Sequence, residues 1–556
     1  MEFFGLTSYG ASDPIKFYLK PDYKEAKTPP KISDVIRERD YQRPFSEAVR
    51  ELDIYSGILD GYAYRSVHRL SKLKKKGFPK PIGPSDTYKN PITQSMVHGW
   101  FLNDIELQDA NWYKPYRYMP KPCSESSKFI EKAIFFSTSD INAAKHSCRL
   151  LVVGGGAGGC TVAAKFSKQM KKDDIIILEP AEKHYYQPMF TLIGGGIKKL
   201  EDSYKLMKEV LPTSAKWLKN SAVEFDPKSN TVTTDNGDII EYEYLLVAMG
   251  LQTYYNQIPG LEDALSIPSG PVCSNYSSKY VDRTYEALQK FQSGNAIFTY
   301  PNTPVKCPGA PQKILYIAEE YFRKTGKRDK ANLIYNSSLA VIFGVKKYAD
   351  ALWKIVKQRN INVNLRTNLI EIKPDQNIAV FQNLDKPEVI TETEYSLLHV
   401  TPPMGAPEML QKNTELTNDA GFLDVNKDTL QHTKYPNVFG IGDCTNSPNS
   451  KTAASVAAQS KIVHINMTAV MAGSEPKMVY NGYASCPLVT GYSSCILAEF
   501  DYNLTPTETF PFSQDREMYI MYMMKKDIMP PLYWKLMLNG YWNGPGAFRK
   551  LMHPFN

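Results

Sequence analysis

The sequence has few cysteines, no long apolar run and no strong excess of charge. Its eight cysteines in 556 residues are too few and too scattered for a disulfide-built scaffold. None of them forms a Cys-x-x-Cys pair or a Cys/His cluster of the kind that binds zinc, so no metal site is expected. No apolar stretch reaches the roughly 18 residues that a membrane-spanning helix needs. A net charge of +8 is mild for this length and gives no case for nucleic-acid binding.

Targeting signals are missing as well. The first residues, MEFFGLTSYGASD, lack the basic and apolar regions of a secretory signal, and they are not Arg- and Ser-rich like a mitochondrial import peptide. We therefore expect an intracellular, reducing compartment. Hydrophobic residues (42%) and charged residues (22%) are present in the proportions of a soluble globular protein. The length suggests about three domains.

The chain changes character near residue 147. Residues 1–146 are rich in Tyr, Pro and Lys and show little periodicity, which predicts an extended and mostly irregular segment. Its aromatic residues, such as Trp100 and Trp112, are unusual in a free linker and suit anchoring into pockets of a large partner. From residue 147 onward, strands and helices alternate as in an α/β protein.

Residues 147–180, SCRLLVVGGGAGGCTVAAKFSKQMKKDDIIILEP, predict a strand, a glycine turn, a helix and a second strand. The turn has the G-x-G-x-x-G spacing and contains Gly154, Gly156, Ala157, Gly158 and Gly159. Its glycines let backbone amides approach a pyrophosphate at the helix N-terminus. Glu179 ends the second strand, at the spacing of the acid that holds ribose hydroxyls. The combination predicts a dinucleotide-binding Rossmann unit.

Two later segments favour FAD over NAD as the dinucleotide. Residues 242–250 and 435–444 each predict a strand that ends in a small-residue turn, and the second turn contains Gly442 and Asp443. This second element resembles the one with which flavoproteins that have two dinucleotide domains hold the ribityl chain of FAD. An aspartate that caps the following helix is compatible with the same role.

A second glycine motif, which enzymes of that superfamily use for NAD(P)H, is missing. We place its expected position at 330–365, with a strand at 331–336 and a helix around 347–358. The connection between them contains Gly344 alone, so its backbone cannot wrap a pyrophosphate. NADH is therefore not the expected electron donor.

Residues from about 147 to 556 resemble sulfide:quinone oxidoreductases of the animal mitochondrial type. The resemblance rests on the blocks EPAEKHYYQPMFTL, GNAIFTYPNTPVKCPGAPQKILY, FGVKKYADAL, HVTPPM, TLQHTKYPNVFGIGDCTNSPNSKTAASVAAQS and SCPLVTGY. It implies a tandem Rossmann-like FAD/NAD(P)-binding fold of the α/β class with C-terminal amphipathic helices. We divide the chain accordingly into FAD-binding parts at 147–265 and 396–480, an inserted Rossmann-like domain at 266–395, and a redox-cysteine and C-terminal region at 481–556.

The resemblance also implies the catalytic and cofactor-binding residues. Cys307 and Cys486 match the two redox cysteines, which in resting family enzymes are bridged by an extra sulfur. Hydrosulfide would make Cys486 a persulfide and release Cys307 as a thiolate, which the adjacent Lys306 would favour. The residues that match FAD-contacting positions are Glu179, Gln187, Ala222, Asp443 and Lys451, with Ala222 contributing backbone contacts only. The other cysteines of the α/β part are expected to be buried small side chains, with Cys444 close to FAD.

The implied reaction takes hydrogen sulfide as substrate, passes sulfur to glutathione or sulfite, and passes two electrons through FAD to ubiquinone. Residues 516–556 contain many Met, Tyr and Trp residues. We expect two short amphipathic helices there, split by Pro530–Pro531, that insert shallowly at a membrane. A Met-rich face packed on the core or on a second copy is the alternative.

Part of the N-terminal segment, residues 93–133, resembles small proteins that line ciliary and sperm-tail doublet microtubules. The resemblance rests on Gly99–Trp100, Arg117 and Ser124–Glu125 through Phe129. It implies a tether to tubulin or doublet-microtubule proteins and a location in the ciliary or flagellar axoneme. The mitochondrial inner membrane is the alternative location. Two other functions stay open: a microtubule inner protein that uses the flavoenzyme fold structurally, and a type-II NADH:quinone oxidoreductase, which the missing glycine motif disfavours.

Overall fold

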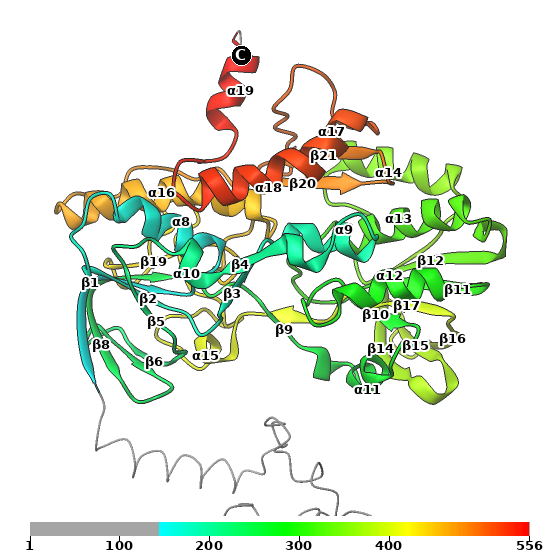
Figure 1. The fold of residues 1–556 in the computed structure, drawn as a ribbon, viewed down its shortest axis with the longest axis horizontal. Coiled ribbons are helices and arrows are strands. Elements are labelled where there is room, and N and C mark those ends of the chain that lie inside the picture. Colours follow the sequence, from blue (N-terminus) through cyan, green and yellow to red (C-terminus); the bar gives the residue numbers. More distant parts are fainter. Residues whose placement is uncertain (1–143, 555–556) are drawn as a thin grey trace, which may run out of the picture. The chain divides into compact units, whose positions relative to one another are not determined.

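Parallel strands with intervening helices dominate the structure, as the alternation of elements after residue 147 predicts. The computed structural model describes residues 144–554. The predicted tandem Rossmann-like α/β class is confirmed by two open sheets flanked by helices, a seven-stranded sheet at the left of Figure 1 and a five-stranded sheet at the right. The division into domains stays a prediction, because the described residues belong to one compact unit.

The first sheet has the strand order β5-β2-β1-β8-β7-β6, with β19 also paired to β8. Its strands are β1 (Lys145–Val153), β2 (Ile175–Leu178), β5 (Lys216–Leu218), β6 (Ala222–Asp226), β7 (Thr231–Thr234), β8 (Ile239–Val247) and β19 (Val438–Gly440). β1 pairs in parallel with β2 and β8, and β19 pairs in parallel with β8. Leu150, Leu151 and Val152 are fully buried, which explains the unbroken apolar run of the predicted strand.

The second sheet has the strand order β10-β17-β11-β12-β13, and all its pairings are parallel. Its strands are β10 (Val272–Cys273), β11 (Gly294–Tyr300), β12 (Ala331–Ser337), β13 (Asn362–Leu365) and β17 (Leu397–His399). The predicted strand 331–336 and helix 347–358 are confirmed as β12 and α14 (Lys346–Gln358). β17 hydrogen-bonds within this second sheet, although the predicted boundary at residue 395 assigns it to the FAD-binding part.

The remaining strands form small ladders. They are β3 (Lys183–Tyr185), β4 (Tyr204–Leu206), β9 (Gln252–Thr253), β14 (Thr367–Lys373), β15 (Ile378–Asn383), β16 (Ile390–Glu394), β18 (Met404–Gly405), β20 (Ala484–Val489) and β21 (Cys495–Phe500). The other helices are α8 (Ala157–Phe166), α9 (Phe190–Gly194), α10 (Met207–Val210), α11 (Leu261–Ser266), α12 (Val281–Lys290), α13 (Ala310–Lys324), α15 (Glu408–Gln411), α16 (Ala453–Met471), α17 (Tyr519–Met523), α18 (Met529–Leu532) and α19 (Gly546–Met552).

The C-terminal region differs from its prediction. Pro530 and Pro531 do not split two helices, because they lie at the start of α18 inside a continuous helical run. A π-helical turn, Met524–Ile528, joins α17 to α18, and the helical run continues to Met537. This run lies along the top of Figure 1, and α19 projects beyond it. Within residues 144–554, none of the helices is long and apolar enough to span a bilayer.

Candidate active site

The glycine turn between β1 and α8 has the geometry that a dinucleotide needs. Gly154 has φ +107°, and a Cβ added to it would lie 2.4 Å from the carbonyl oxygen of Ala248. A Cβ on Gly159 would lie 1.8 Å from the carbonyl oxygen of Gly154, so the helix packs on the turn only with glycine there. A Cβ on Gly156 would meet nothing within 4 Å. The turn is therefore closed toward the sheet and open on the side where a pyrophosphate would bind.

The N-terminus of α8 leaves room for an anion. Gly156 caps the helix without any side-chain hydrogen bond, and the first turn contains no acidic residue. The free backbone N–H groups and the positive end of the helix dipole favour a phosphate at that point. Glu179 follows β2 and accepts hydrogen bonds from the backbone N–H groups of Gly155 and Ala181, each at 2.7 Å. Its burial raises the pKa of this carboxyl, and both oxygens keep lone pairs for ribose hydroxyls.

Three turns from distant parts of the chain converge at this end of the sheet. Ala248 donates to Val153 at 2.8 Å, and Ile441 donates to Val247 at 3.1 Å. A Cβ on Gly158 would lie 2.8 Å from Ile441. The turns that follow β1, β8 and β19 therefore meet, as the predicted FAD site requires.

Asp443 is the acid of the third turn. It is half-buried, and its burial raises its pKa against the opposing charges of Lys451 and Lys306. Lys451 donates to the carbonyl oxygens of Thr445 and Ser447 at 2.6 and 3.2 Å, which holds its charge near Asp443. Gln187 is exposed and Ala222 is buried at the start of β6. No hydrogen bond among residues 144–554 links either of them to the glycine turn.

Cys307 and Cys486, which lie far apart in the sequence, are neighbours in the structure. Cys307 lies in the loop between β11 and α13, and Cys486 lies on β20, which packs against α13. Each of the two thiols is the largest influence on the pKa of the other. A Cβ added to Gly309 would lie 2.6 Å from Cys486 Sγ, so the glycine makes room for the sulfur. All seven described cysteines are free thiols.

The loop holds Cys307 in an unusual conformation. Its φ of +54° is in the left-handed region, which costs energy for a residue other than glycine and is frequent at functional sites. Its N–H donates to the carbonyl oxygen of Lys451 at 2.8 Å, and its own carbonyl accepts from the N–H of Ala310 at 2.8 Å. These bonds fix the thiol between the candidate FAD site and the start of α13.

A buried lysine lies beside the Cys307 sulfur. Lys313, in the first turns of α13, has its Nζ 3.1 Å from Cys307 Sγ and is 2% exposed. Lys525 is also buried and donates to the carbonyl oxygen of Pro188 at 2.9 Å. The neighbouring thiol of Cys486 and the charges of both lysines hold the pKa of Cys307 well below its usual range, despite burial. In contrast, the interaction with Cys307 and burial raise the pKa of Cys486.

Sequence reasoning missed both of these lysines. It expected Lys306 to favour the thiolate. Burial lowers the pKa of Lys306 to about 8, and the charge of Lys306 lowers the pKa of Asp443 instead. Lys313 follows Cys307 by six residues, and the helical spacing after the Pro-Gly turn was the available signal. Lys525 comes from the C-terminal region, and no local pattern connects it to Cys307.

The other cysteines match their predicted role. Cys148, Cys160, Cys273 and Cys495 are at most 7% exposed, and burial raises the pKa of each of them. Cys444 is fully buried next to the third turn, and burial raises its pKa to about 11. These thiols stay protonated at neutral pH, so Cys307 is the one described cysteine whose surroundings favour a thiolate.

The loop that contains Cys307 occupies the place of a phosphate-binding turn. β11 lies at the centre of the second sheet, and β11, α13 and β12 form the βαβ unit there. A glycine motif for NAD(P)H would therefore follow β11, which corrects the position predicted at 330–365. Residues 301–309 contain Gly309 alone among glycines. The missing motif is thus replaced by the cysteine loop.

Comparisons with known proteins show which oxidoreductases this chain is similar to. A family model described as pyridine nucleotide-disulphide oxidoreductase matches residues 148–294. The mitochondrial sulfide:quinone oxidoreductase of Mus musculus is 54% identical over 375 residues, which cover 67% of this chain and 83% of the mouse protein. The mitochondrial sulfide:quinone oxidoreductase of Dictyostelium discoideum is 45% identical over 368 residues, which cover 66% of this chain and 80% of that protein.

The solved structure of the sulfide:quinone oxidoreductase from Aquifex aeolicus has the same fold. It aligns with a TM-score of 0.61 at 20% identity, over 73% of this chain and 95% of that chain. The predicted resemblance of residues 93–133 to microtubule proteins lies outside the described residues. The two relatives described above are mitochondrial enzymes, which supports the mitochondrial alternative and leaves the ciliary location without support.

The sequence identity extends over most of the mouse protein's length. The structure also places Cys307 and Cys486, which the resemblance pairs, next to each other. On the 54% identity over 83% of the mouse protein, the chain belongs to the sulfide:quinone oxidoreductase family.

Proposed function

We propose that the protein is a flavin-dependent sulfide:quinone oxidoreductase in which Cys486 takes up sulfur and Cys307 leaves as a thiolate. One observation carries this proposal: Cys307 Sγ lies 3.1 Å from the ammonium of Lys313 and interacts with the neighbouring thiol of Cys486. A thiolate that is stabilised in this way is a good leaving group in thiol–disulfide exchange. Cys486, whose thiol is favoured over its thiolate, is then the sulfur that is attacked.

The sulfur step is a thiol–disulfide exchange. Hydrosulfide attacks Sγ of Cys486 in a Cys307–Cys486 disulfide, and the bond between the two cysteines breaks as a new S–S bond forms. Cys486 becomes a persulfide that keeps the hydrosulfide proton, and Cys307 takes the electron pair of the broken bond. The negative charge thus moves from hydrosulfide to Cys307, where Lys313 and Lys525 compensate it.

Family membership implies a flavin cofactor and a quinone acceptor, and the residues present fit FAD. The turn open at Gly156 would hold the pyrophosphate, Glu179 would hold the ribose, and Gly442 with Asp443 would hold the ribityl chain. The other proposed contacts come from Gly154, Ala157, Gly158, Gly159, Gln187, Ala222 and Lys451. When bound, FAD would supply a two-electron acceptor for the Cys307 thiolate and a donor for ubiquinone. Lys451 would keep Asp443 ionised against its burial.

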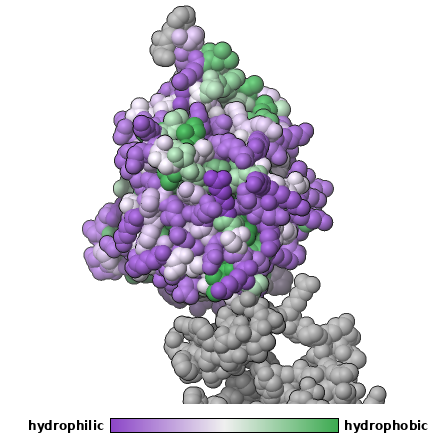
Figure 2. Space-filling view, turned by 90° about the vertical axis from the view of Figure 1, so that its left-hand side faces the viewer, coloured by the Kyte–Doolittle hydropathy of each residue, from purple (hydrophilic) through white to green (hydrophobic). Residues whose placement is uncertain are grey.

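The C-terminal face is our candidate for contact with a membrane that holds ubiquinone. Its exposed apolar side chains are Tyr519, Ile520, Ile528, Leu536, Tyr541, Phe548 and Leu551. Figure 2 shows apolar residues gathered near the C-terminal end of the described chain. Basic residues such as Lys526 and Arg549 lie in the same segment, as in helices that rest in a membrane interface. We propose the mitochondrial inner membrane as the location, and glutathione or sulfite as the sulfur acceptor.

Purified protein tests this function. Protein with yellow bound FAD should lose its flavin absorbance when sulfide is added without oxygen, and NADH should not have this effect. Cys486→Ala should abolish the bleaching, and Cys148→Ala should not, because Cys148 is buried away from the pair. Bleaching by NADH would favour the type-II NADH:quinone oxidoreductase alternative. FAD that does not respond to sulfide would favour a structural role of the fold.

A further inference from the structure

Polar side chains gather where the strands of the five-stranded sheet end, next to the cysteine pair. Its strands are parallel, so their carboxyl ends meet at one edge, which is where α/β proteins bind ligands. His399 pairs with Phe298, which pairs in turn with Tyr335, so these three side chains lie on the same face. Thr401 lies two residues beyond His399 and therefore continues on that face.

Several of these groups are buried without a hydrogen-bond partner among residues 144–554. The unpartnered atoms at this edge are Asn275 Nδ2, Tyr276 Oη, Tyr335 Oη, His399 Nδ1 and Thr401 Oγ1. All five residues are at most 5% exposed. The backbone N–H of Asn275 donates to His399 Nε2 at 3.2 Å, so the ring proton is on Nδ1. A buried polar group that stays unpaired is costly, so this edge is built to receive a polar molecule.

Two of these hydroxyl groups follow β10 and β17, on the same side of the sheet as the end of β11. Tyr276 and Thr401 are neighbours, but their hydroxyls are not positioned to hydrogen-bond to each other. The charge of Cys307 helps to raise the pKa of Tyr276, and the charges of both cysteines help to raise the pKa of the adjacent Tyr300. The Cys307 loop itself follows Tyr300, the last residue of β11. Tyr276 and Thr401 therefore lie at the same sheet edge as the loop that contains Cys307.

We propose that the hydroxyl groups of Tyr276 and Thr401 bind the incoming sulfide before it attacks Cys486. This inference rests on the proposed function and adds two substrate-binding residues to it. A hydroxyl donates to hydrosulfide and accepts from hydrogen sulfide, so it serves both protonation states. The burial of both residues limits the ligand to a molecule about as small as water, which sulfide is and a peptide thiol is not. Lys313 and Lys525 supply the positive potential that favours the anion.

The test uses Tyr276→Phe and Thr401→Val, which remove one hydroxyl each and keep the shape of the side chain. The full-length flavoprotein, in its disulfide form, is mixed with sulfide without quinone, and mass spectrometry counts the persulfide on Cys486. We expect each variant to need about tenfold more sulfide for half-maximal persulfide formation, with a similar rate at saturation. Thr401→Ser keeps the hydroxyl and should restore the normal sulfide dependence.

Two controls separate sulfide binding from a structural effect. Tyr242→Phe removes another buried and unpartnered hydroxyl, on β8 of the other sheet, and should leave the sulfide dependence unchanged. Reduction of the disulfide by dithiothreitol, a thiol too large for the site, should proceed equally in all variants. If wild-type protein forms no persulfide, the proposed function fails. Wild-type protein can form the persulfide while Tyr276→Phe and Thr401→Val show the wild-type dependence on sulfide concentration. That result would overturn the inference alone and would mean that this edge of the sheet holds structural water.

Discussion

Lys313 is the residue on which the reactivity of Cys307 depends. Lys313→Met removes the ammonium 3.1 Å from the sulfur and should raise the pKa of Cys307. Because alkylation needs the thiolate, the rate of Cys307 alkylation by iodoacetamide at pH 6.5 should fall about tenfold or more. The measurement is peptide mass spectrometry over time. Lys306→Met should change the rate little, and an equal loss in both variants would contradict the assignment.

Gly309 decides whether the two sulfurs can approach each other. An alanine Cβ there would lie 2.6 Å from Cys486 Sγ, well inside van der Waals contact. Gly309→Ala should therefore push Cys486 away from Cys307 and slow formation of the disulfide by a mild oxidant. Free thiols counted after oxidation measure this effect. Gly546→Ala is the matched control, because a Cβ at that position meets nothing within 4 Å.

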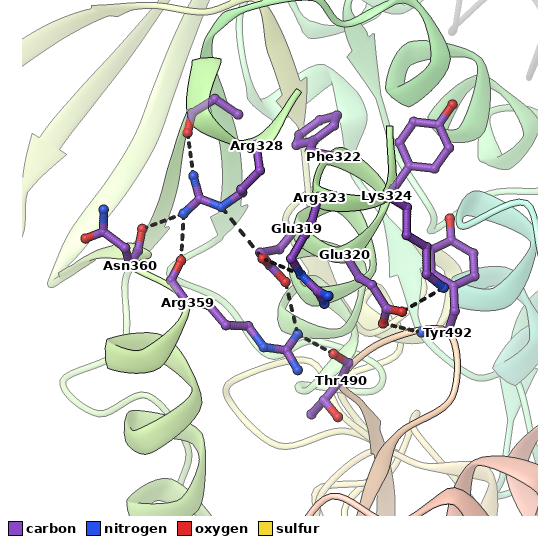
Figure 3. Close-up of polar contacts among 12 residues, drawn as sticks. Glu319, Glu320, Phe322, Arg323, Lys324, Arg328, Arg359, Asn360, Thr490 and Tyr492 are labelled. Carbon is purple, nitrogen blue, oxygen red and sulfur yellow. Dashed lines mark hydrogen bonds and ion pairs between the residues drawn. The ribbon is translucent and has the colours of Figure 1, made fainter. Parts of the chain in front are cut away.

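At the scale of elements, α13 is anchored by a buried charge cluster that Figure 3 shows. Glu319 pairs with Arg323, Arg328 and Arg359 at 3.5, 3.7 and 3.4 Å. Arg359 also donates to the carbonyl oxygen of Thr490, just after the strand of Cys486. The neighbouring Glu320 accepts from the N–H of Tyr492 at 2.8 Å. The cluster ties the helix of Lys313 to the strand of Cys486.

Loss of this cluster should destabilise the fold. Glu319→Gln removes the buried negative charge and leaves the guanidinium group of Arg328 without its carboxylate partner, while Arg359 keeps its pair with Glu517. We expect the free energy of unfolding to fall by about 3 kcal/mol, measured by urea denaturation. Asp350→Asn breaks the exposed pair with Lys346 on α14 and should cost less than about 0.5 kcal/mol. Equal losses of unfolding free energy in both variants would show that the burial of Glu319 does not strengthen its ion pairs.

The C-terminal helices give a prediction about membranes. Tyr519, Ile520 and Leu551 are 62%, 57% and 73% exposed, so they contribute little to the core. Replacing all three with serine should weaken sedimentation with phospholipid vesicles severalfold and leave the unfolding midpoint nearly unchanged. The matched control replaces Val341 and Val389, which are 50% and 43% exposed on the five-stranded side of the chain. Equal vesicle binding by both variants would contradict the membrane face.

For the whole molecule, buried thiols predict a loss of stability at alkaline pH. The pKa is raised above its ordinary value for Cys148, Cys160, Cys273, Cys444, Cys486 and Cys495. In the unfolded chain these thiols ionise near pH 8.5. Above that pH the unfolded state binds fewer protons than the folded state, so the free energy of unfolding falls as pH rises.

Buried lysines work in the opposite direction and are fewer. Burial lowers the pKa of Lys165, Lys306 and Lys525 to about 8, so the unfolded state holds their protons longer between about pH 8 and 10.5. The six thiols outnumber them, and urea denaturation at pH 8, 9 and 10 should show a net decrease in stability. The double variant Cys148→Ala, Cys495→Ala should flatten this decrease. Stability that rises over the same range would contradict the prediction.

The sequence by itself determined the features that depend on local pattern. The glycine turn, Glu179 and the strands before Gly250 and Asp443 were predictable because each lies within one strand-turn-helix unit or at its end. The family blocks then identified Cys307 and Cys486 as a pair. The sequence predicted helices in the C-terminal region but not that they form one continuous run. The π-helical turn before Pro530 depends on backbone hydrogen bonds, which the pattern of apolar residues does not reveal.

Only the tertiary structure decided what surrounds the sulfur of Cys307. Lys313 comes from the next helix and Lys525 from the C-terminal run, and the proposed sulfide-binding residues Tyr276 and Thr401 follow two other strands of the same sheet. The positions of Lys525, Tyr276 and Thr401 do not follow from distances along the chain, since the fold brings these distant segments together. Sequence reasoning therefore chose Lys306, the nearest cation in the chain. The fold instead brings Lys313 to the thiolate, because a helix that starts just after Cys307 returns its first turns to the sulfur.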